Sequence, residues 1–436
     1  MNRTLPTLAA AGVLLAAPWV LPTTASAAAP ISDVKISWSD ATHTKIKVTW
    51  TEAAPVANTV EIPGEEPVTV AAGAPNQALL PTATVGRTSA DGKHQIAVRG
   101  PNGAEARSVE FDSYVYAPPS IQVSFPAYDQ LRWTVPVDTA VDGTPNDPLD
   151  LPGPTKYEVT WGNGTGDPDP LHGPFPNSCG GASTATTSPT GTIAKPDGPY
   201  ELIVGGVNEW GSAAVKAVPV DTIDDVSVVE PGRTSYGATT TLTGHVGGSV
   251  LDIEEYRGVC WKYSGARTDT TVVVHQRTGN NEPWTVVGTT KTDVRGNYSA
   301  TFRNPGHRQY RVVVANSLPR ADDYRGAIRF GADSRTVAVR SQTRIVSAKF
   351  INPVVALGTQ PQAYLWADPA GSQRAALQFK NASGAWQGLS YKTLSAGRGL
   401  LTFPWNKRGV TQFRWWVPGS PTVDEIYGAA FTLTVR

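Results

Sequence analysis

Aromatic and cationic residues gather in one stretch near the end of the chain. Trp405, Lys407 and Arg408 fall in a loop with turn-forming residues, and Arg414 and Trp416 alternate with apolar residues in the segment that follows. A strand period of two places Arg414 and Trp416 on its outer face. A large ring on the outer face of a sheet exposes apolar area, which is uncommon without a purpose. We interpret these five residues as a ligand-binding surface in which rings stack on sugars and cations pair with negative groups.

Two alternatives remain open for the rings. Trp416 can instead pack on the preceding domain or on a long side chain across the sheet, and Trp405 can fold back over the end of its domain. Six other tryptophans occupy apolar positions of alternating runs, so we expect them in the core: Trp38, Trp50, Trp133, Trp161, Trp284 and Trp386.

Motifs that would indicate catalysis are missing from the sequence. It contains no G-x-S-x-G, no H-E-x-x-H, no P-loop and no G-x-G-x-x-G. The six histidines are scattered without the short spacing of zinc ligands. Pairs such as Asp167/Asp169, Asp224/Asp225 and Asp322/Asp323 could bind calcium, but solvated acidic turns explain them better. We therefore expect no enzyme, no metal and no cofactor.

Two stretches of the second half match each other and reveal the element that carries these residues. One runs from Gln276 to Val314 and the other from Gln378 to Val417. Trp284 precedes Tyr310 by 26 residues, and Trp386 precedes Phe413 by 27. A period near one hundred residues indicates a repeated domain. With 42 Gly and 36 Pro among 436 residues, the sequence predicts an all-β chain of four tandem β-sandwiches.

The first two domains are predicted over residues 28–117 and 118–222. In the first, Ile46, Val48 and Trp50 lie on one face of an alternating strand. The second resembles the fibronectin type III family through a tryptophan in its second strand and a later run that contains Tyr200, Leu202, Val204, Asn208 and Gly211. In the first domain His94 stands where the second has Tyr200. The resemblance implies seven-strand sandwiches used for spacing or binding.

The third and fourth domains are predicted over residues 223–340 and 341–436. The shared pattern of Gln, Trp, Gly and an aromatic residue followed by Arg is similar to the bacterial Ig-like repeats of secreted proteins from high-GC Gram-positive bacteria. Residues 251–269 form an insertion that only the third domain has. The register predicts that Phe413, Trp415 and Val417 point inward. The four domains leave no stretch for a catalytic domain.

The N-terminal residues 1–27 have the features of a signal peptide. Arg3 precedes an apolar run from Leu8 to Leu21, and Ala25-Ser26-Ala27 offers a cleavage site. A transmembrane anchor is the weaker alternative, because the run is shorter than the about 20 residues that span a bilayer. We expect a secreted, extracellular chain without a membrane span after cleavage, in association with the cell wall.

The net charge of zero conceals a strong asymmetry. Residues 28–220 carry 11 Lys and Arg against 21 Asp and Glu, whereas residues 341–436 carry 10 against 3. The basic end could attract an anionic polymer or hold the acidic end of the chain. The two cysteines, Cys179 and Cys260, fall in different domains, and we predict a disulfide between them. Free thiols or an intermolecular bond are the alternatives.

The sequence thus favours a secreted, non-catalytic binding protein. Its basic, aromatic C-terminal domain would dock on an extracellular or cell-wall polysaccharide or anionic polymer. The alternative is a structural or adhesive spacer that mediates protein–protein contacts without a small ligand. Nucleic acid is a weaker partner, since a basic extracellular domain does not distinguish DNA from other polyanions.

Overall fold

The fold is all-β. The structure, a computed structural model, describes residues 30–62, 64–162, 181–214, 217–254, 259–319 and 325–436. In these ranges the chain forms strands and two 3₁₀ turns, η1 (Thr82–Thr84) and η2 (Pro101–Gly103), but no α-helix. Contacts divide it into two compact units. The first holds the described residues up to Tyr114 together with Ala140–Pro152, and the second holds Val115–Thr139 and the chain from Gly153 onward.

The first unit is a sandwich of two sheets, as the alternating pattern predicts. Its sheets have the strand orders β1-β2-β5 and β4-β3-β6-β7. The strands are β1 (Ile31–Trp38), β2 (Lys45–Glu52), β3 (Asn58–Glu61), β4 (Val68–Val70), β5 (Gln77–Pro81), β6 (Ala97–Arg99) and β7 (Glu105–Arg107). Ile46, Val48 and Trp50 are all buried, which confirms the face predicted for that strand.

A strap from the chain beyond β9 completes the first unit. Residues Ala140–Pro152 belong to it, and Leu149 of this strap is fully buried. Trp38 donates its indole N–H to the Leu149 carbonyl at 2.9 Å, and the Gly143 amide donates to Ala90 at 2.9 Å. The chain therefore passes between the two units three times.

The second sandwich begins the second unit. Its sheets have the orders β12-β9-β8 and β11-β10-β13-β15. The strands are β8 (Gln122–Ala127), β9 (Gln130–Thr134), β10 (Lys156–Gly162), β11 (Gly181–Thr186), β12 (Thr190–Ala194), β13 (Tyr200–Asn208), β14 (Gly211–Ala213) and β15 (Val218–Val226). Leu131, Trp133 and Leu202 lie in its core.

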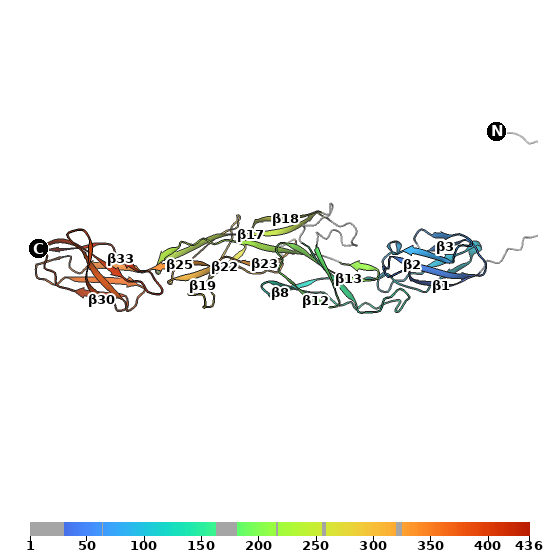
Figure 1. Ribbon diagram of the computed structural model, residues 1–436, viewed down its shortest axis with the longest axis horizontal. Coiled ribbons are helices and arrows are strands. Elements are labelled where there is room, and N and C mark those ends of the chain that lie inside the picture. Colours follow the sequence, from blue (N-terminus) through green and yellow to red (C-terminus); the bar gives the residue numbers. More distant parts are fainter. Residues whose placement is uncertain (1–29, 63, 163–180, 215–216, 255–258, 320–324) are drawn as a thin grey trace, which may run out of the picture. The chain divides into compact units, whose positions relative to one another are not determined.

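Strand β15 is shared by the second and third sandwiches. Its first half pairs with β13 and its second half with β17 (Thr239–Glu254). The insertion that the sequence predicts after Leu251 forms a hairpin of β17 with β18 (Val259–Ala266), and the two strands run side by side in Figure 1. Strand β23 (Ile328–Phe330) adds to β15 in parallel and places Phe330 in the second core. The predicted boundary after Thr222 thus lies inside a continuous strand.

The third and fourth sandwiches repeat one plan. Their larger sheets have the orders β16-β25-β22-β19-β20 and β27-β34-β32-β29-β30. The third contains β16 (Arg233–Ser235), β19 (Thr271–Arg277), β20 (Thr285–Lys291), β21 (Asn297–Arg303), β22 (Arg308–Val314), β24 (Ala332–Asp333) and β25 (Val337–Gln342). The fourth contains β26 (Arg344–Phe350), β27 (Val354–Val355), β28 (Gln362–Asp368), β29 (Arg374–Lys380), β30 (Trp386–Thr393), β31 (Arg398–Thr402), β32 (Gly409–Val417), β33 (Ile426–Tyr427) and β34 (Phe431–Val435).

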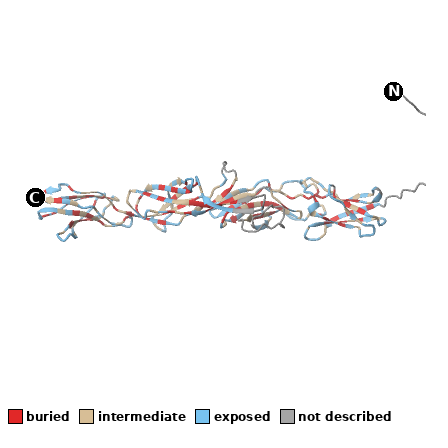
Figure 2. Cartoon of the chain, turned by 90° about the horizontal axis from the view of Figure 1, so that it is seen from above, coloured by how far each residue is buried: buried red, intermediate tan, exposed pale blue. Residues whose placement is uncertain are grey.

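Burial alternates along the repeated strands. Phe413, Trp415 and Val417 are fully buried, as predicted, and Arg414 and Trp416 between them are only partly covered. Figure 2 shows buried positions along the strands with exposed ones between them. The outer sheet faces are therefore the surfaces on which ligand-binding side chains can lie.

Candidate functional site

The structure separates the five predicted binding residues into two groups. Arg414 and Trp416 lie on the outer face of the β29-β30-β32 sheet, together with Trp386, Tyr391 and Tyr427. We call this the arginine–aromatic face. Trp405, Lys407 and Arg408 lie in the loop before β32, at the end of the fourth sandwich that is opposite the third. The two groups do not form one surface patch through any contact among the described residues.

Arg414 is the centre of the arginine–aromatic face. Its guanidinium lies 4.4 Å from the ring centre of Trp386 and 4.4 Å from that of Tyr427. Its Nε donates a hydrogen bond to Gln378 Oε1. A cation between two rings is stabilised by both quadrupoles, so this arginine is held in place by the protein itself. It has little freedom to change partners.

Trp416 is also engaged, across the sheet. Its ring stacks on Tyr427 with a centre distance of 6.3 Å, and its indole N–H donates to Glu425 at 3.0 Å. This contact matches the alternative in which Trp416 packs across the sheet. Tyr391 and Tyr427 are the more exposed rings of the face, at 56% and 48%.

Trp405 does not present a ring to solvent, contrary to the binding interpretation. It is 6% exposed and packs edge-on against Phe379 and Phe413 at 5.2 and 5.0 Å between ring centres. The loop folds back because burial of the apolar indole ring lowers the free energy of the folded chain relative to leaving the ring in water. Its Nε1 is buried without a hydrogen-bond partner. Lys407 lies over the same rings, 5.5 Å from Trp405 and 5.1 Å from Phe379.

Lys407 and Arg408 are exposed and belong to what we call the basic tip, made of Lys380, Lys407 and Arg408. Lys380 ends β29 and Gly409 begins β32, and the pairing of Phe379 with Phe413 brings these strand ends to the same end of the sandwich. At the opposite end Asp424 contacts the third sandwich. The tip therefore faces away from that junction.

Charges in the fourth sandwich are segregated along its length. Its three acidic residues are all engaged near the third sandwich: Asp368 pairs with Arg344 at 2.6 Å, Asp424 pairs with Arg340, and Glu425 accepts from Trp416. Within the described residues, no carboxylate pairs with any cation of the basic tip. The excess positive charge is thus concentrated away from the junction.

The third sandwich has a related arrangement, in which one tryptophan lies between two arginines instead of one arginine between two aromatic rings. Trp284 lies between Arg277 and Arg311, at 4.4 and 4.8 Å. The expectation that Trp284 and Trp386 are core residues is therefore wrong. Both lie on outer faces under guanidinium groups. Trp386 pairs with Lys380, which follows the inward-facing Phe379 and so lies on the other face of the sheet.

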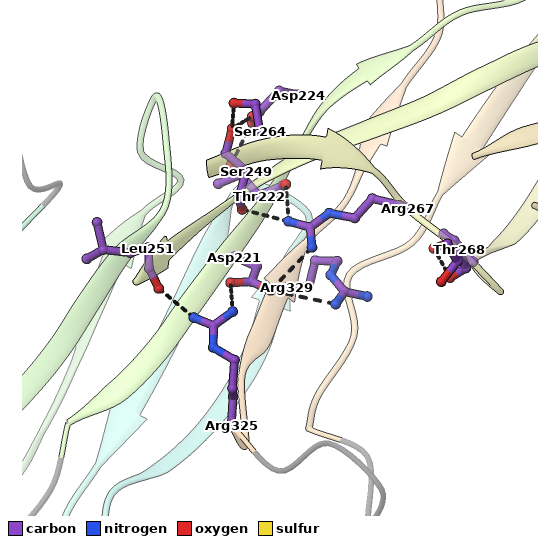
Figure 3. A network of polar contacts seen from close by, with 11 residues as sticks. Asp221, Thr222, Asp224, Ser249, Leu251, Ser264, Arg267, Thr268, Arg325 and Arg329 are labelled. Carbon is purple, nitrogen blue, oxygen red and sulfur yellow. Dashed lines mark hydrogen bonds and ion pairs between the residues drawn. The ribbon is translucent and has the colours of Figure 1, made fainter. Parts of the chain in front are cut away.

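A buried charge network locks the junction of the second and third sandwiches. Asp221 of β15 is 2% exposed and lies 3.3 to 3.7 Å from the guanidinium nitrogens of Arg267, Arg325 and Arg329. Arg267 also donates to the Ser249 carbonyl at 2.7 Å, and Arg325 to the Leu251 carbonyl at 2.6 Å (Figure 3). Burial lowers the pKa of Arg267. One carboxylate therefore joins β15, the β17–β18 hairpin and the β23 segment.

The first unit contains a cluster of carboxylates that sequence reasoning missed. Asp112, Asp147 and Asp150 each offer an oxygen within 4.8 Å of the others. Burial raises the pKa of Asp147, and burial with the charges of Asp147 and Asp142 raises the pKa of Asp150 to about 6. Asp112 already accepts hydrogen bonds from Thr144 and the Tyr114 amide. The separation of 35 residues between Asp112 and Asp147 hides this cluster in the sequence.

The remaining predicted residues are placed as follows. Cys179, Asp167, Asp169, Asp322 and Asp323 lie outside the described residues, and Cys260 occupies β18 opposite Ile253. Asp224 accepts hydrogen bonds from Thr222 and Ser249, and Asp225 pairs with His245 at 3.2 Å.

Comparison with known proteins gives only distant likenesses. No protein-family model matches the sequence, and no curated protein matches it. Among solved structures, the FN1–FN3 domains of chicken CNTN1 match 72% of this chain and 99% of their own at 12% identity and a TM-score of 0.24. The D0–D1 domain of intimin matches 49% of this chain and 97% of its own at 12% identity and a TM-score of 0.17. No helix among the described residues is long and apolar enough to cross a membrane. The fold is accordingly established by the sheets themselves: the chain is built of β-sandwiches.

Proposed function

We propose that this chain is a secreted, non-catalytic spacer whose sandwiches mediate protein–protein contacts outside the cell. The observation that carries the proposal is the construction of the second unit. Strand β15 belongs to two sandwiches at once, and Asp221 ties that strand to Arg267, Arg325 and Arg329 in a buried network. A junction made of shared strands resists bending, which a flexible linker does not.

The junction of the third and fourth sandwiches supports the same function. Only Thr343 separates β25 from β26, and its amide donates to the Asp424 carbonyl at 3.0 Å. The Asp424 amide donates in turn to Ser341 at 2.7 Å. These backbone bonds, with the ion pair of Asp424 to Arg340, hold two consecutive sandwiches without a free linker.

Neutral polysaccharide docking has weaker support than the spacer. Trp405 is buried, and Arg414 and Trp416 are occupied by partners within the fourth sandwich. The arginine–aromatic face instead has the composition of a protein contact surface, in which Trp, Tyr and Arg are enriched. Its exposed rings, Tyr391 and Tyr427, are the residues we expect to touch a partner.

The spacer is tested by distance measurements between spin labels at Thr192 and Thr289, introduced as non-canonical amino acids so that both cysteines stay. These exposed sites lie in the second and third sandwiches. We expect a narrow distribution that Asp221→Ala broadens. Asp225→Ala removes an exposed carboxylate on the same strand and should leave it narrow. A broad distribution in the unaltered chain would contradict the spacer.

The contact surface is tested by a photo-crosslinking residue at Tyr391 in the producing cells. The matched control is Tyr263 of β18, which is 52% exposed against 56% for Tyr391. We expect a discrete adduct of one partner protein from position 391 only. Equal labelling from both positions would remove the arginine–aromatic face as a specific surface.

A further inference from the structure

We infer that the basic tip of the fourth sandwich is a binding site for a phosphate-bearing anionic polymer. The inference does not depend on the spacer function. It narrows the polymer docking expected from the sequence to one chemical class and one end of one domain. Three observations carry it: cations without carboxylate partners, an unpartnered buried donor, and the arrangement of the cations around that donor.

The first observation is the absence of local counter-charge. Lys380, Lys407 and Arg408 are exposed, and none of them pairs with a carboxylate within the described part of the chain. Elsewhere in the second unit, the exposed Arg233, Arg335 and Arg340 each face a carboxylate, and the exposed Arg374 and Arg398 lie over the rings of Tyr391 and Trp366. Uncompensated cations at one end create a local positive potential that attracts anions.

The second observation is the indole N–H of Trp405. The Trp405 side chain is only 6% exposed, and its Nε1 has no hydrogen-bond acceptor. The half-buried indole of Trp38 and the buried indole of Trp415 donate to the carbonyls of Leu149 and Tyr364, whereas the buried Nε1 of Trp50 in the first unit also lacks an acceptor. A buried donor without an acceptor is uncommon and calls for an explanation, and at the basic tip an anion from outside the chain would supply the acceptor once the side chain that covers Nε1 moves aside.

The third observation is where the cations stand relative to that donor. The Lys407 ammonium lies 5.5 Å from the centre of the Trp405 ring, so it covers the residue that needs the acceptor. Arg408 follows it, and Lys380 ends the neighbouring strand next to Phe379, on which Trp405 packs at 5.2 Å. An anion that pairs with Lys407 therefore arrives beside the indole.

Phosphate fits this arrangement better than carboxylate. The donors come from three separate places in the chain: the loop before β32, the end of β29 and the Trp405 indole. A phosphate group presents its oxygens tetrahedrally, whereas a carboxylate presents two in a plane. Arginine binds phosphate through two parallel N–H groups of its guanidinium, and lysine binds it through the compact positive charge of its ammonium group.

The test uses the full chain, sodium polyphosphate as the probe, and ¹⁵N-labelled tryptophan. Trp405→Phe identifies the indole signal of Trp405 among those of the other tryptophans. We expect this signal to move on titration, and Lys407→Ala with Arg408→Ala to weaken binding by about tenfold or more at low salt. Lys392→Ala with Arg398→Ala removes the same charge from elsewhere in the fourth sandwich and is the matched control.

Four outcomes would overturn the inference. One is the lack of any binding at low salt. Another is an equal loss of affinity in the two double variants, which would show attraction by net charge alone. A third is binding that leaves the Trp405 signal unmoved. Equal affinity and an equal Trp405 shift with polygalacturonate would overturn the assignment to phosphate.

Discussion

Arg414 donates a hydrogen bond of 2.7 Å from its Nε to Gln378 Oε1, on the neighbouring strand of the fourth sandwich. In the third sandwich the residue paired with Arg311 is His275, whereas Gln276 pairs with Tyr310. The Oε1 of Gln276 is buried without a hydrogen-bond partner. Gln276 therefore provides a control in which a partly buried glutamine is removed without the loss of a bond.

We predict that Gln378→Leu destabilises the fourth sandwich by about 1–2 kcal/mol, because it leaves the Arg414 Nε without its acceptor. Gln276→Leu should change the stability of the third by less than about 0.5 kcal/mol, since no bond is lost. Hydrogen exchange of the β29 and β19 amides measures each change locally. Equal effects of the two substitutions would show that Gln276 Oε1 also accepts a hydrogen bond in solution.

A second prediction concerns two buried tyrosines. The Tyr298 hydroxyl donates to the Ser227 carbonyl at 2.6 Å, whereas the Tyr200 hydroxyl has no partner. Tyr298→Phe should cost about 1 kcal/mol, and Tyr200→Phe should be neutral or stabilising. Exchange rates of the β21 and β13 amides report the two effects. A comparable loss at Tyr200 would indicate that its hydroxyl is satisfied in solution.

The difference in hydrogen bonding between Tyr298 and Tyr200 shows what a resemblance in sequence cannot predict. In the first sandwich His94 takes the place of Tyr200, and its Nε2 lies 2.8 Å from the Gly86 carbonyl. The sequence alone identifies the equivalent positions. Whether a polar atom there finds an acceptor depends on the path of the loop opposite, which no local pattern encodes.

The sheets were predictable because alternation of apolar residues follows from burial of one face. Trp284 and Trp386 were misassigned because a tryptophan in an alternating run can lie on either face, and the guanidinium groups that cover these two rings come largely from neighbouring strands. The bulge residues Val287 and Leu389, each skipped in the pairing of its strand, come after the two tryptophans in the chain. The sequence also could not predict that two sandwiches share β15, because a strand shared by two domains has the same alternation of apolar residues as a strand within one domain.

The basic loop illustrates a different limit. Its composition correctly indicated a turn that carries cations. The same sequence, however, is compatible with a Trp405 ring that is exposed to solvent and with one that folds inward. Trp405 folds inward because Phe379, Phe403 and Phe413 already form an aromatic group at that end of the core. Those partners come from β29, from the residue after β31 and from β32, which only the fold brings together.

A third prediction follows from the carboxylates of the strap. The pKa of Asp150 in the folded state is about 6, above its usual value of 3.8, so the folded state holds the proton more tightly. Strap docking is therefore most stable below pH 4, and this stabilisation is lost as the pH rises through about 6. Amides of residues 143–150 should exchange several-fold faster at pH 7.5 than at pH 5, after correction for intrinsic rates.

Asp150→Asn should remove most of that pH dependence, because the neutral amide no longer repels Asp147. Glu66→Gln changes an exposed acid of the same unit and is the control. A wild-type strap that exchanges equally at both pH values would contradict the raised pKa.

A fourth prediction concerns the cysteines, whose pairing stays a sequence-based prediction. Digestion under non-reducing conditions should yield one linked peptide that contains Cys179 and Cys260. The bond would close a loop between the second and third sandwiches and add to the Asp221 network there. Recovery of both cysteines as alkylated thiols, or of a dimer that reduction dissolves, would exclude it.

The fifth prediction concerns Asp424, at the junction of the third and fourth sandwiches. Its carboxylate pairs with Arg340, lies 3.2 Å from Arg233, and lies 3.8 Å from the Nε2 of His307. Asp424→Asn keeps the size of the side chain and its backbone bonds but removes the charge that attracts the two arginines. Because a single carboxylate faces both Arg340 and Arg233, its loss leaves them with mutual repulsion and loosens the junction. Trypsin should then cleave after Arg340 and Arg344 several-fold faster than in the unaltered chain.

The control is Glu425→Gln, which neutralises the adjacent residue. The Glu425 carboxylate accepts a hydrogen bond from Trp416, so its neutralisation should leave the cleavage rate unchanged. Faster cleavage in both variants would mean that net charge, rather than the contacts of Asp424, protects the junction.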